Sequence, residues 1–114
     1  MDISIIHFIP YGKENAIKRD ELTRLCKEAD LIDFKLSDDE AYRILRRLLE
    51  KERINYVILN NCDGKGYYRP TKEDYAELRK YIHQEEARAK RVFKNIQQAR
   101  KLEEDYKCDR LEHE

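Results

Sequence analysis

Four basic side chains recur on one face of a predicted helix that runs from residue 38 to residue 51. They are Arg43, Arg46, Arg47 and Lys51. Arginine binds phosphate oxygens strongly and can donate two hydrogen bonds to the edge of a guanine base. We therefore interpret these residues as a nucleic-acid contact. A solvated helix face is the alternative interpretation, because charged side chains are mostly exposed.

A second group of such residues lies in a predicted β-hairpin. Lys65 at its tip and Arg69 on its return strand are placed to contact phosphate or to enter a minor groove. Tyr67 and Tyr68 point to opposite faces of the sheet, so one is expected in the core and the other at the surface. An exposed tyrosine can hydrogen-bond phosphate, and we include Tyr68 in the predicted nucleic-acid contact.

The residues that catalysis or metal binding needs are too scattered to predict either. Cys26, Cys62 and Cys108 are odd in number and widely spaced, so they predict reduced thiols and a cytoplasmic protein. The sequence has no Cys-x-x-Cys, no His-Glu-x-x-His and no glycine-rich phosphate loop. The apolar run at residues 3–9 is too short to span a bilayer. We therefore predict no enzyme activity, no cofactor, no metal and no membrane partner.

The charge of the chain is balanced overall but segregated along it. The formal net charge of the 114 residues is zero, which by itself counts against nucleic-acid binding. Residues 43–69 nevertheless carry net +4 and residues 79–101 net +6, whereas residues 102–114 carry net −4. Because a phosphate backbone responds to local charge, this segregation keeps duplex DNA as the expected partner. The basic residues of 79–101 spread around the predicted last helix, so we interpret them mainly as the solvated exterior of a coiled coil.

The elements that position these residues are mostly helical, since only three glycines and two prolines interrupt the chain. Residues 2–9 suit either a strand or a short helix. The segments that follow predict a helix at 19–29, an inward-packing break with Leu31, Ile32 and Phe34, a helix at 38–51, strands at 54–59 and 66–70, and a final helix from 72 to about 107. Ser37 and Glu40 form a capping box for the second helix, and Thr71 caps the last one with Asp74 at N3.

The last predicted helix is roughly 50 Å long at 1.5 Å per residue, which is longer than a 70-residue domain is wide. Its apolar residues follow a heptad pattern that Glu85 interrupts. We expect its far half to pair with a second copy of the chain through Ala89, Val92, Phe93, Ile96 and Ala99. The acidic tail from Glu103 suits an antiparallel pair, although the sequence leaves the direction open. A helix that folds back on its own domain is the alternative.

Three stretches resemble small winged-helix proteins common in phages and prophages of Firmicutes. They are residues 12–22 (GKENAIKRDEL), residues 66–70 (GYYRP) and the segment with Arg88-Ala89-Lys90 and Val92-Phe93. The resemblance implies a winged helix-turn-helix with a helical tail, and DNA binding in phage regulation or replication. The chain departs from a typical DNA reader at Asp38-Asp39-Glu40, where basic or amide residues usually meet the base edges.

We therefore predict a mainly α-helical winged helix-turn-helix domain at residues 1–70, followed at residues 71–114 by a long helix that joins a homodimer. The predicted function is non-catalytic binding of duplex DNA, with the second helix in a major groove. A phage-borne inhibitor of a host protein or nucleoprotein complex, such as an anti-CRISPR, is the first alternative, and structural assembly through the long helix is the second. Zero net charge and the acidic residues at 38–40 suit a protein partner or a nucleic-acid mimic.

Overall fold

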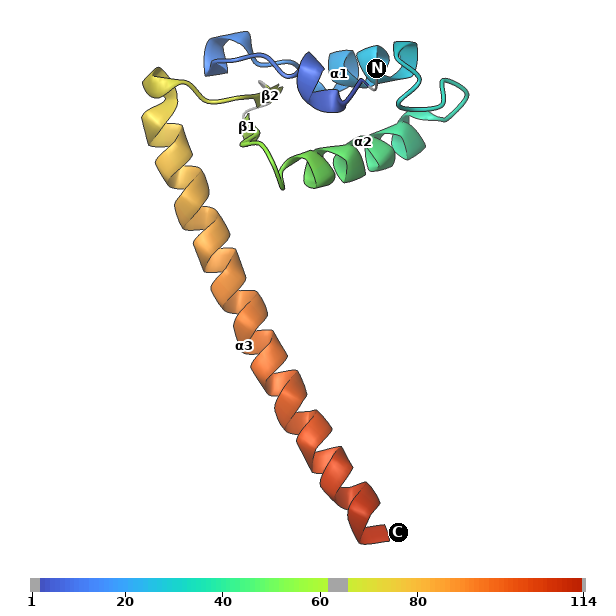
Figure 1. The fold of residues 1–114 in the computed structure, drawn as a ribbon, viewed down its shortest axis with the longest axis vertical. Coiled ribbons are helices and arrows are strands. Elements are labelled where there is room, and N and C mark those ends of the chain that lie inside the picture. Colours follow the sequence, from blue (N-terminus) through green and yellow to red (C-terminus); the bar gives the residue numbers. More distant parts are fainter. Residues whose placement is uncertain (1–2, 62–65, 114) are drawn as a thin grey trace. The chain divides into compact units, whose positions relative to one another are not determined.

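The computed structural model describes residues 3–61 and 66–113 (Figure 1). Its elements are the 3₁₀ helices η1 (Ile5–Phe8), η2 (Lys13–Asn15) and η3 (Lys72–Asp74), the helices α1 (Arg19–Glu28), α2 (Asp38–Glu52) and α3 (Tyr75–His113), and the strands β1 (Leu59–Asn61) and β2 (Gly66–Tyr68). The predicted mainly helical chain, with a small hairpin and a long C-terminal helix, is confirmed. Contacts divide the chain into two compact units, residues 1–78 and 79–114, so the boundary lies inside α3.

The core of the first unit lies where α1, α2 and η1 meet. Leu22 and Cys26 from α1 are fully buried, and Leu25 and Ala29 are half-buried, so the predicted apolar stripe packs inward. Helix α2 buries three side chains spaced by four residues, which are Ala41, Leu45 and Leu49. The residues of η1 contact both helices. The ambiguous N-terminal segment is thus a short helix that covers the α1–α2 pair (Figure 1).

The connection between α1 and α2 packs less fully than predicted. Ile32 is buried and Leu31 is half-buried, but Phe34 has 69% of its surface exposed. The expectation that Phe34 packs inward is wrong, because the chain turns tightly there to reach Ser37. The Ser37 hydroxyl accepts a hydrogen bond from the Glu40 N–H at 3.4 Å, so its predicted role as N-cap of α2 is confirmed.

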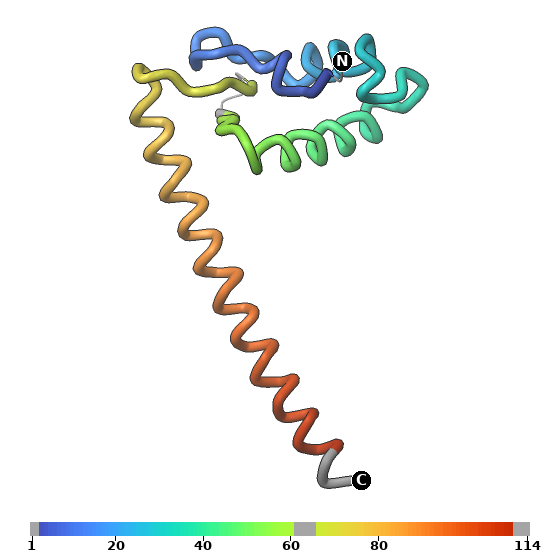
Figure 2. The backbone as a smooth tube through the Cα atoms, viewed as in Figure 1, coloured from blue at the N-terminus to red at the C-terminus, as the bar shows by residue number. Residues whose placement is uncertain are grey.

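The hairpin is shorter than the sequence predicts. The first strand begins at Leu59 and not at Ile54, because the backbone at Ile54–Tyr56 continues to bond back to the end of α2. In the antiparallel register, Leu59 pairs with Tyr68 and Asn61 pairs with Gly66. Figure 2 follows the chain from α2 through this turn into the hairpin. The predicted turn at Asp63-Gly64 lies outside the described residues.

An extended segment at Ile17 adds a third partner to the hairpin. The Ile17 N–H donates to the Tyr67 carbonyl at 2.9 Å, and the Tyr67 N–H donates to the Ile17 carbonyl at 2.8 Å. Gly66, beside this contact, has φ +99°. A Cβ atom placed there would lie 2.0 Å from the Ile17 carbonyl oxygen, so only glycine permits this close approach.

Helix α3 begins one 3₁₀ turn later than predicted. The Thr71 N–H and the Thr71 hydroxyl donate to Asp74 Oδ2 at 3.0 and 3.3 Å, and the Asp74 N–H donates to the Thr71 carbonyl at 3.0 Å. The predicted cap at Thr71 is therefore confirmed, with η3 as the first turn. From Ile82 to Arg110 every side chain of α3 is exposed. Within the described ranges no helix combines the length and the apolar character that a bilayer crossing requires.

Candidate nucleic-acid interface

The predicted basic face of α2 is exposed. Arg43, Arg46, Arg47 and Lys51 all lie at the surface, opposite the buried stripe of the same helix. Among the described residues, none of these four side chains lies within 4 Å of a carboxylate, and the pair predicted between Asp39 and Arg43 does not form. Four positive charges on one helix face are therefore available to an anionic partner.

Two of these arginines line a surface hollow of about 450 Å³. Its walls come from α2, from the N-terminus of α1 and from β2, and its lining residues are Arg19, Asp39, Tyr42, Arg43, Leu45, Arg46 and Tyr67. Three of the seven carry a guanidinium group and one carries a carboxylate. A hollow with this excess of positive charge suits a phosphate group, which arginine binds through paired hydrogen bonds.

Arg19 is held in the hollow by an aromatic ring and a carboxylate. Its guanidinium carbon lies 3.8 Å from the centre of the Tyr42 ring, and its Nε lies 3.5 Å from Asp20 Oδ1. The Tyr42 hydroxyl donates to the same Asp20 oxygen at 2.6 Å. This hydrogen bond lowers the pKa of Asp20, assisted by the nearby Arg19 charge, and it raises the pKa of Tyr42. Arg19 is thus oriented before any ligand arrives.

Two of the predicted contacts from the hairpin, Tyr68 and Arg69, do not line this hollow. Arg69 is half-buried, and its guanidinium stacks over the rings of Tyr11 at 4.4 Å and Tyr56 at 5.1 Å. Tyr68 is completely buried, as is most of Tyr67, so the expectation of one exposed tyrosine is wrong. Both faces of β2 are covered, which removes Tyr68 from any surface contact. The predicted contact at Lys65 lies outside the described residues.

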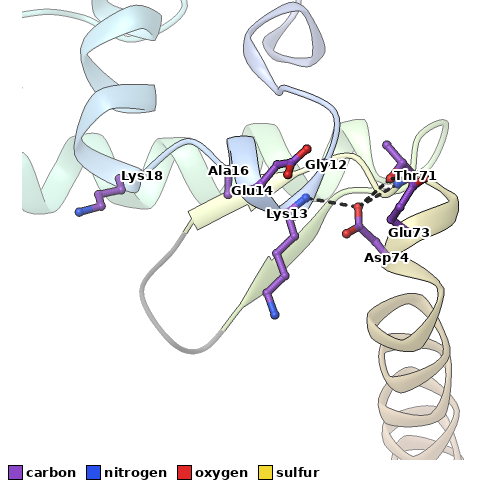
Figure 3. A pocket seen from close by; sticks show the side chains of 8 residues that line it. All are labelled: Gly12, Lys13, Glu14, Ala16, Lys18, Thr71, Glu73 and Asp74. Atoms are coloured by element: carbon purple, nitrogen blue, oxygen red, sulfur yellow. Dashed lines mark hydrogen bonds between the residues drawn. The ribbon is translucent and has the colours of Figure 1, made fainter.

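A second hollow, of about 590 Å³, lies between η2 and η3. Its charges are mixed, and Figure 3 shows Asp74 accepting hydrogen bonds from Lys13 and Thr71. Asp74 is buried and accepts the Lys13 N–H at 3.2 Å, while the Lys13 ammonium lies 3.1 Å from Glu77 Oε1. The hydrogen bond from Lys13 lowers the pKa of Glu77. We interpret these contacts as a brace for the start of α3 and not as a ligand site.

Possible metal ligands are dispersed among the described residues, and Cys26 is buried while Cys108 is exposed. The described residues contain no group of three or more His, Cys, Asp or Glu side chains that would hold a metal ion. Cys26 is buried, and burial raises the pKa of its thiol to about 11, which keeps it protonated and unreactive. Cys108 is exposed on α3.

The residues that the sequence proposes for dimerisation lie exposed along α3. Ala89, Val92, Phe93, Ile96 and Ala99 all face solvent in the single chain.

Sequence reasoning missed Arg19, Tyr42 and Tyr67 as parts of the hollow. Arg19 and Tyr42 are 23 positions apart, and no spacing rule relates them. They meet because α1 packs across α2, which depends on tertiary contacts. The signal that was available is Arg19 itself, because it is a cation at the start of α1, where the helix dipole favours acidic residues such as Asp20 and Glu21.

Comparisons of the chain with family models, with curated proteins and with solved structures give no match. The function therefore has to be inferred from the residues and their geometry.

Proposed function

We propose that this chain is a non-catalytic protein that binds duplex DNA through a winged helix-turn-helix, as in phage regulation or replication. The order of α1, α2 and the hairpin supports this proposal. So does the extended segment at Ile17, which pairs with β2 as a further strand of a wing sheet would. The proposed active form is a homodimer joined through α3.

The observation that carries the proposal is the convergence of arginines on one hollow. Arg19, Arg43 and Arg46 come from two helices, and the structure gives the two on α2 no ion-pair partner among its described residues. Arg47 and Lys51 extend the same positive face along α2. Side chains in this arrangement would contact consecutive phosphates of one DNA strand.

The acidic start of α2 decides which part of the DNA is contacted. Asp38, Asp39 and Glu40 occupy its first turn, where a recognition helix usually reads base edges. Carboxylates there repel phosphates, so we infer that the middle of α2 contacts the backbone and that little sequence is read. Residues 1–78 carry net −2, because residues 79–114 hold 10 basic and 8 acidic side chains in a chain of net charge zero. Affinity would therefore depend on the local patch and fall steeply with salt.

The salt dependence of duplex binding tests the proposal. Each phosphate contact contributes about 0.9 to the slope of log K against log salt concentration. We expect Arg43→Gln with Arg46→Gln to reduce that slope by about 2 and to weaken binding similarly for unrelated sequences. Fluorescence anisotropy with two random duplexes, at several salt concentrations, measures both quantities.

Arg24→Gln provides the matched control. Arg24 is an exposed arginine of α1, but its guanidinium is already paired with Glu21 and with Glu28, the latter at 2.6 Å. Its replacement should leave the slope unchanged. Equal slopes for the wild type and the Arg43→Gln/Arg46→Gln variant would remove these residues from the site, and no binding at low salt would refute DNA as the partner.

A protein partner is the second candidate, favoured by a different surface. Ile54 has 81% of its surface exposed, and Tyr11, Tyr56 and Val57 are exposed as well. Tyr11 and Tyr56 are joined by Arg69, which stacks on both rings. Tyrosine and arginine are enriched at the centres of protein interfaces. An inhibitor of a host protein would use this patch, and substitutions in α2 would then leave its binding unchanged.

A further inference from the structure

The apolar side chains of α3 form an exposed stripe along the second unit. The large ones each expose 43–60% of their surface, and they are Ile82, Val92, Phe93, Ile96, Leu102 and Tyr106. Ile82, Ala89 and Ile96 recur every seven residues, and so do Val92, Ala99 and Tyr106. Phe93 and Leu102 flank these two rows, so the apolar residues share one side of the helix. A stripe of this pattern is the surface by which two helices pack as a coiled coil.

We propose that the partner of this stripe is α3 of a second copy, running antiparallel. The proposal rests on the homodimer of the proposed function, and it is independent of DNA binding. Charge decides the direction. Residues 79–101 carry net +6, whereas residues 102–114 carry net −4. A parallel pair places like charges side by side, and an antiparallel pair places each acidic end against the basic stretch of the other copy.

Charged residues at the helix–helix contact positions of the stripe distinguish the parallel from the antiparallel pair more sharply. Glu85, Glu103 and Arg110 occupy positions of the seven-residue repeat that face the partner. In a parallel pair each of them meets its own copy, so that two carboxylates or two guanidinium groups lie together. Burying like charges against each other is strongly unfavourable. Such a pair would carry three repulsive layers.

One antiparallel register converts this repulsion into attraction. When Ile96 faces Ala99 of the second copy, Glu85 lies opposite Arg110 of that copy. In the same register, small Ala89 faces large Tyr106. By symmetry each contact occurs twice in the dimer.

The flanking positions agree with this register. Glu86 falls beside Lys107 of the second copy, and Arg88 falls beside its Asp109. Glu103 faces Val92 and lies about one helical turn from Arg88 of the second copy, within reach of that guanidinium. In the single chain Arg88 lies 3.8 Å from Glu85, and both side chains are exposed, so this contact exchanges readily with contacts to a partner.

Cysteine cross-linking distinguishes the two directions in the full chain. In a background with Cys62→Ser and Cys108→Ser, we expect a mixture of Ala89→Cys and Tyr106→Cys chains to form a mixed disulfide under mild oxidation. Neither variant alone should cross-link, because residue 89 of one copy lies roughly 25 Å along the axis from residue 89 of the other. A parallel pair gives the opposite result, with Ala89→Cys cross-linked to itself.

Two further measurements complete the test: the molecular mass of the protein in solution, and the effect of exchanging the charges at Glu85 and Arg110. Sedimentation equilibrium should give the mass of a dimer. Glu85→Arg should raise the dimer dissociation constant by about tenfold, and Glu85→Arg with Arg110→Glu should restore it. A monomer at tens of micromolar would refute the dimer and the direction together. Self-linked Ala89→Cys, or a double variant no better than the single one, would refute the direction alone. Neither outcome changes the salt dependence that tests DNA binding.

Discussion

At the scale of single residues, the central feature is the chain of contacts from Arg19 to Tyr42 to Asp20. The ring of Tyr42 holds the guanidinium, while its hydroxyl holds the Asp20 carboxylate. One tyrosine therefore positions both charges at the start of α1. This arrangement keeps Arg19 directed toward the hollow that Arg43 and Arg46 also line. The same arrangement places the Asp20 carboxylate next to the proposed phosphate site, where its negative charge opposes phosphate binding.

The titration of Asp20 tests this arrangement. Its pKa is lowered in the folded protein, first by the hydrogen bond from Tyr42. A lowered pKa contributes stability that is present above the ordinary value of 3.8 and is lost as pH falls through the folded value. In Tyr42→Phe the pKa should rise toward the ordinary value. The pKa of Asp20 can be measured from its carboxyl carbon chemical shift by NMR. The titration should cover roughly pH 2 to 6, the range in which carboxylates lose their proton.

Tyr106→Phe is the control for that titration, because Tyr106 lies exposed on α3 and far along the chain from Asp20. It should leave the Asp20 midpoint where it is in the wild type. An Asp20 midpoint that is the same in Tyr42→Phe and in the wild type would mean that the hydrogen bond does not form in solution.

At the same scale, the sequence identified the residues of one helix face but not those brought together by packing. Arg43, Arg46, Arg47 and Lys51 lie exposed because helical spacing alone sets their direction. Arg19 was missed and Tyr68 was wrongly predicted to be exposed. The position of each depends on how the helices and strands pack against one another, which residue spacing does not reveal. Arg69 was predicted on the return strand, but β2 ends at Tyr68. The stacking of Arg69 on Tyr11 and Tyr56 involves residues 58 and 13 positions away.

At the scale of elements, the hairpin and the segment at Ile17 form one unit that depends on Gly66. Gly12 and Gly66 both have positive φ, at +91° and +99°. Only at Gly66 would a side chain collide with backbone, 2.0 Å from the Ile17 carbonyl oxygen. At Gly12 the nearest atom to an added Cβ is a side-chain nitrogen at 3.5 Å. Replacing Gly12 therefore tests the energetic cost of a positive φ alone, whereas replacing Gly66 tests that cost together with a steric clash against the backbone.

We expect Gly12→Ala to lower the free energy of unfolding by about 1–3 kcal/mol, which is the cost of its conformation. Gly66→Ala should lower it further, because the backbone contact between Ile17 and Tyr67 must also break. Chemical denaturation followed by circular dichroism measures both. Equal losses in the two variants would show that the close approach at Ile17 is absent in solution.

The elements themselves were largely predictable, and their ends were not. Apolar spacing located α1, α2 and α3, and Ser37 and Thr71 marked two of their starts. The first strand was predicted five residues too early, because Ile54, Tyr56 and Val57 suit a strand by residue type. The backbone of Ile54 and Tyr56 instead continues the turn at the end of α2. Local preference was overridden there by the need to reverse the chain.

At the scale of the whole molecule, a net charge of zero conceals two differently charged surfaces, for which we propose different partners. The first unit concentrates arginines at one hollow although its net charge is −2. The second unit carries opposite charges at its two ends and an apolar stripe between them. A count over the whole sequence therefore says little about either surface, and partners follow from where each charge lies.

The most direct measurement of the central claim is the mapping of a bound duplex by NMR. Backbone amide shifts of labelled protein, titrated with a short random duplex at low salt, report which residues meet the DNA. The proposed interface predicts that the largest changes cluster at Arg19, Tyr42, Arg43, Arg46 and Arg47, and that they fade as salt is added. Changes confined to Tyr11, Ile54, Tyr56 and Val57, or no changes at all, would contradict it.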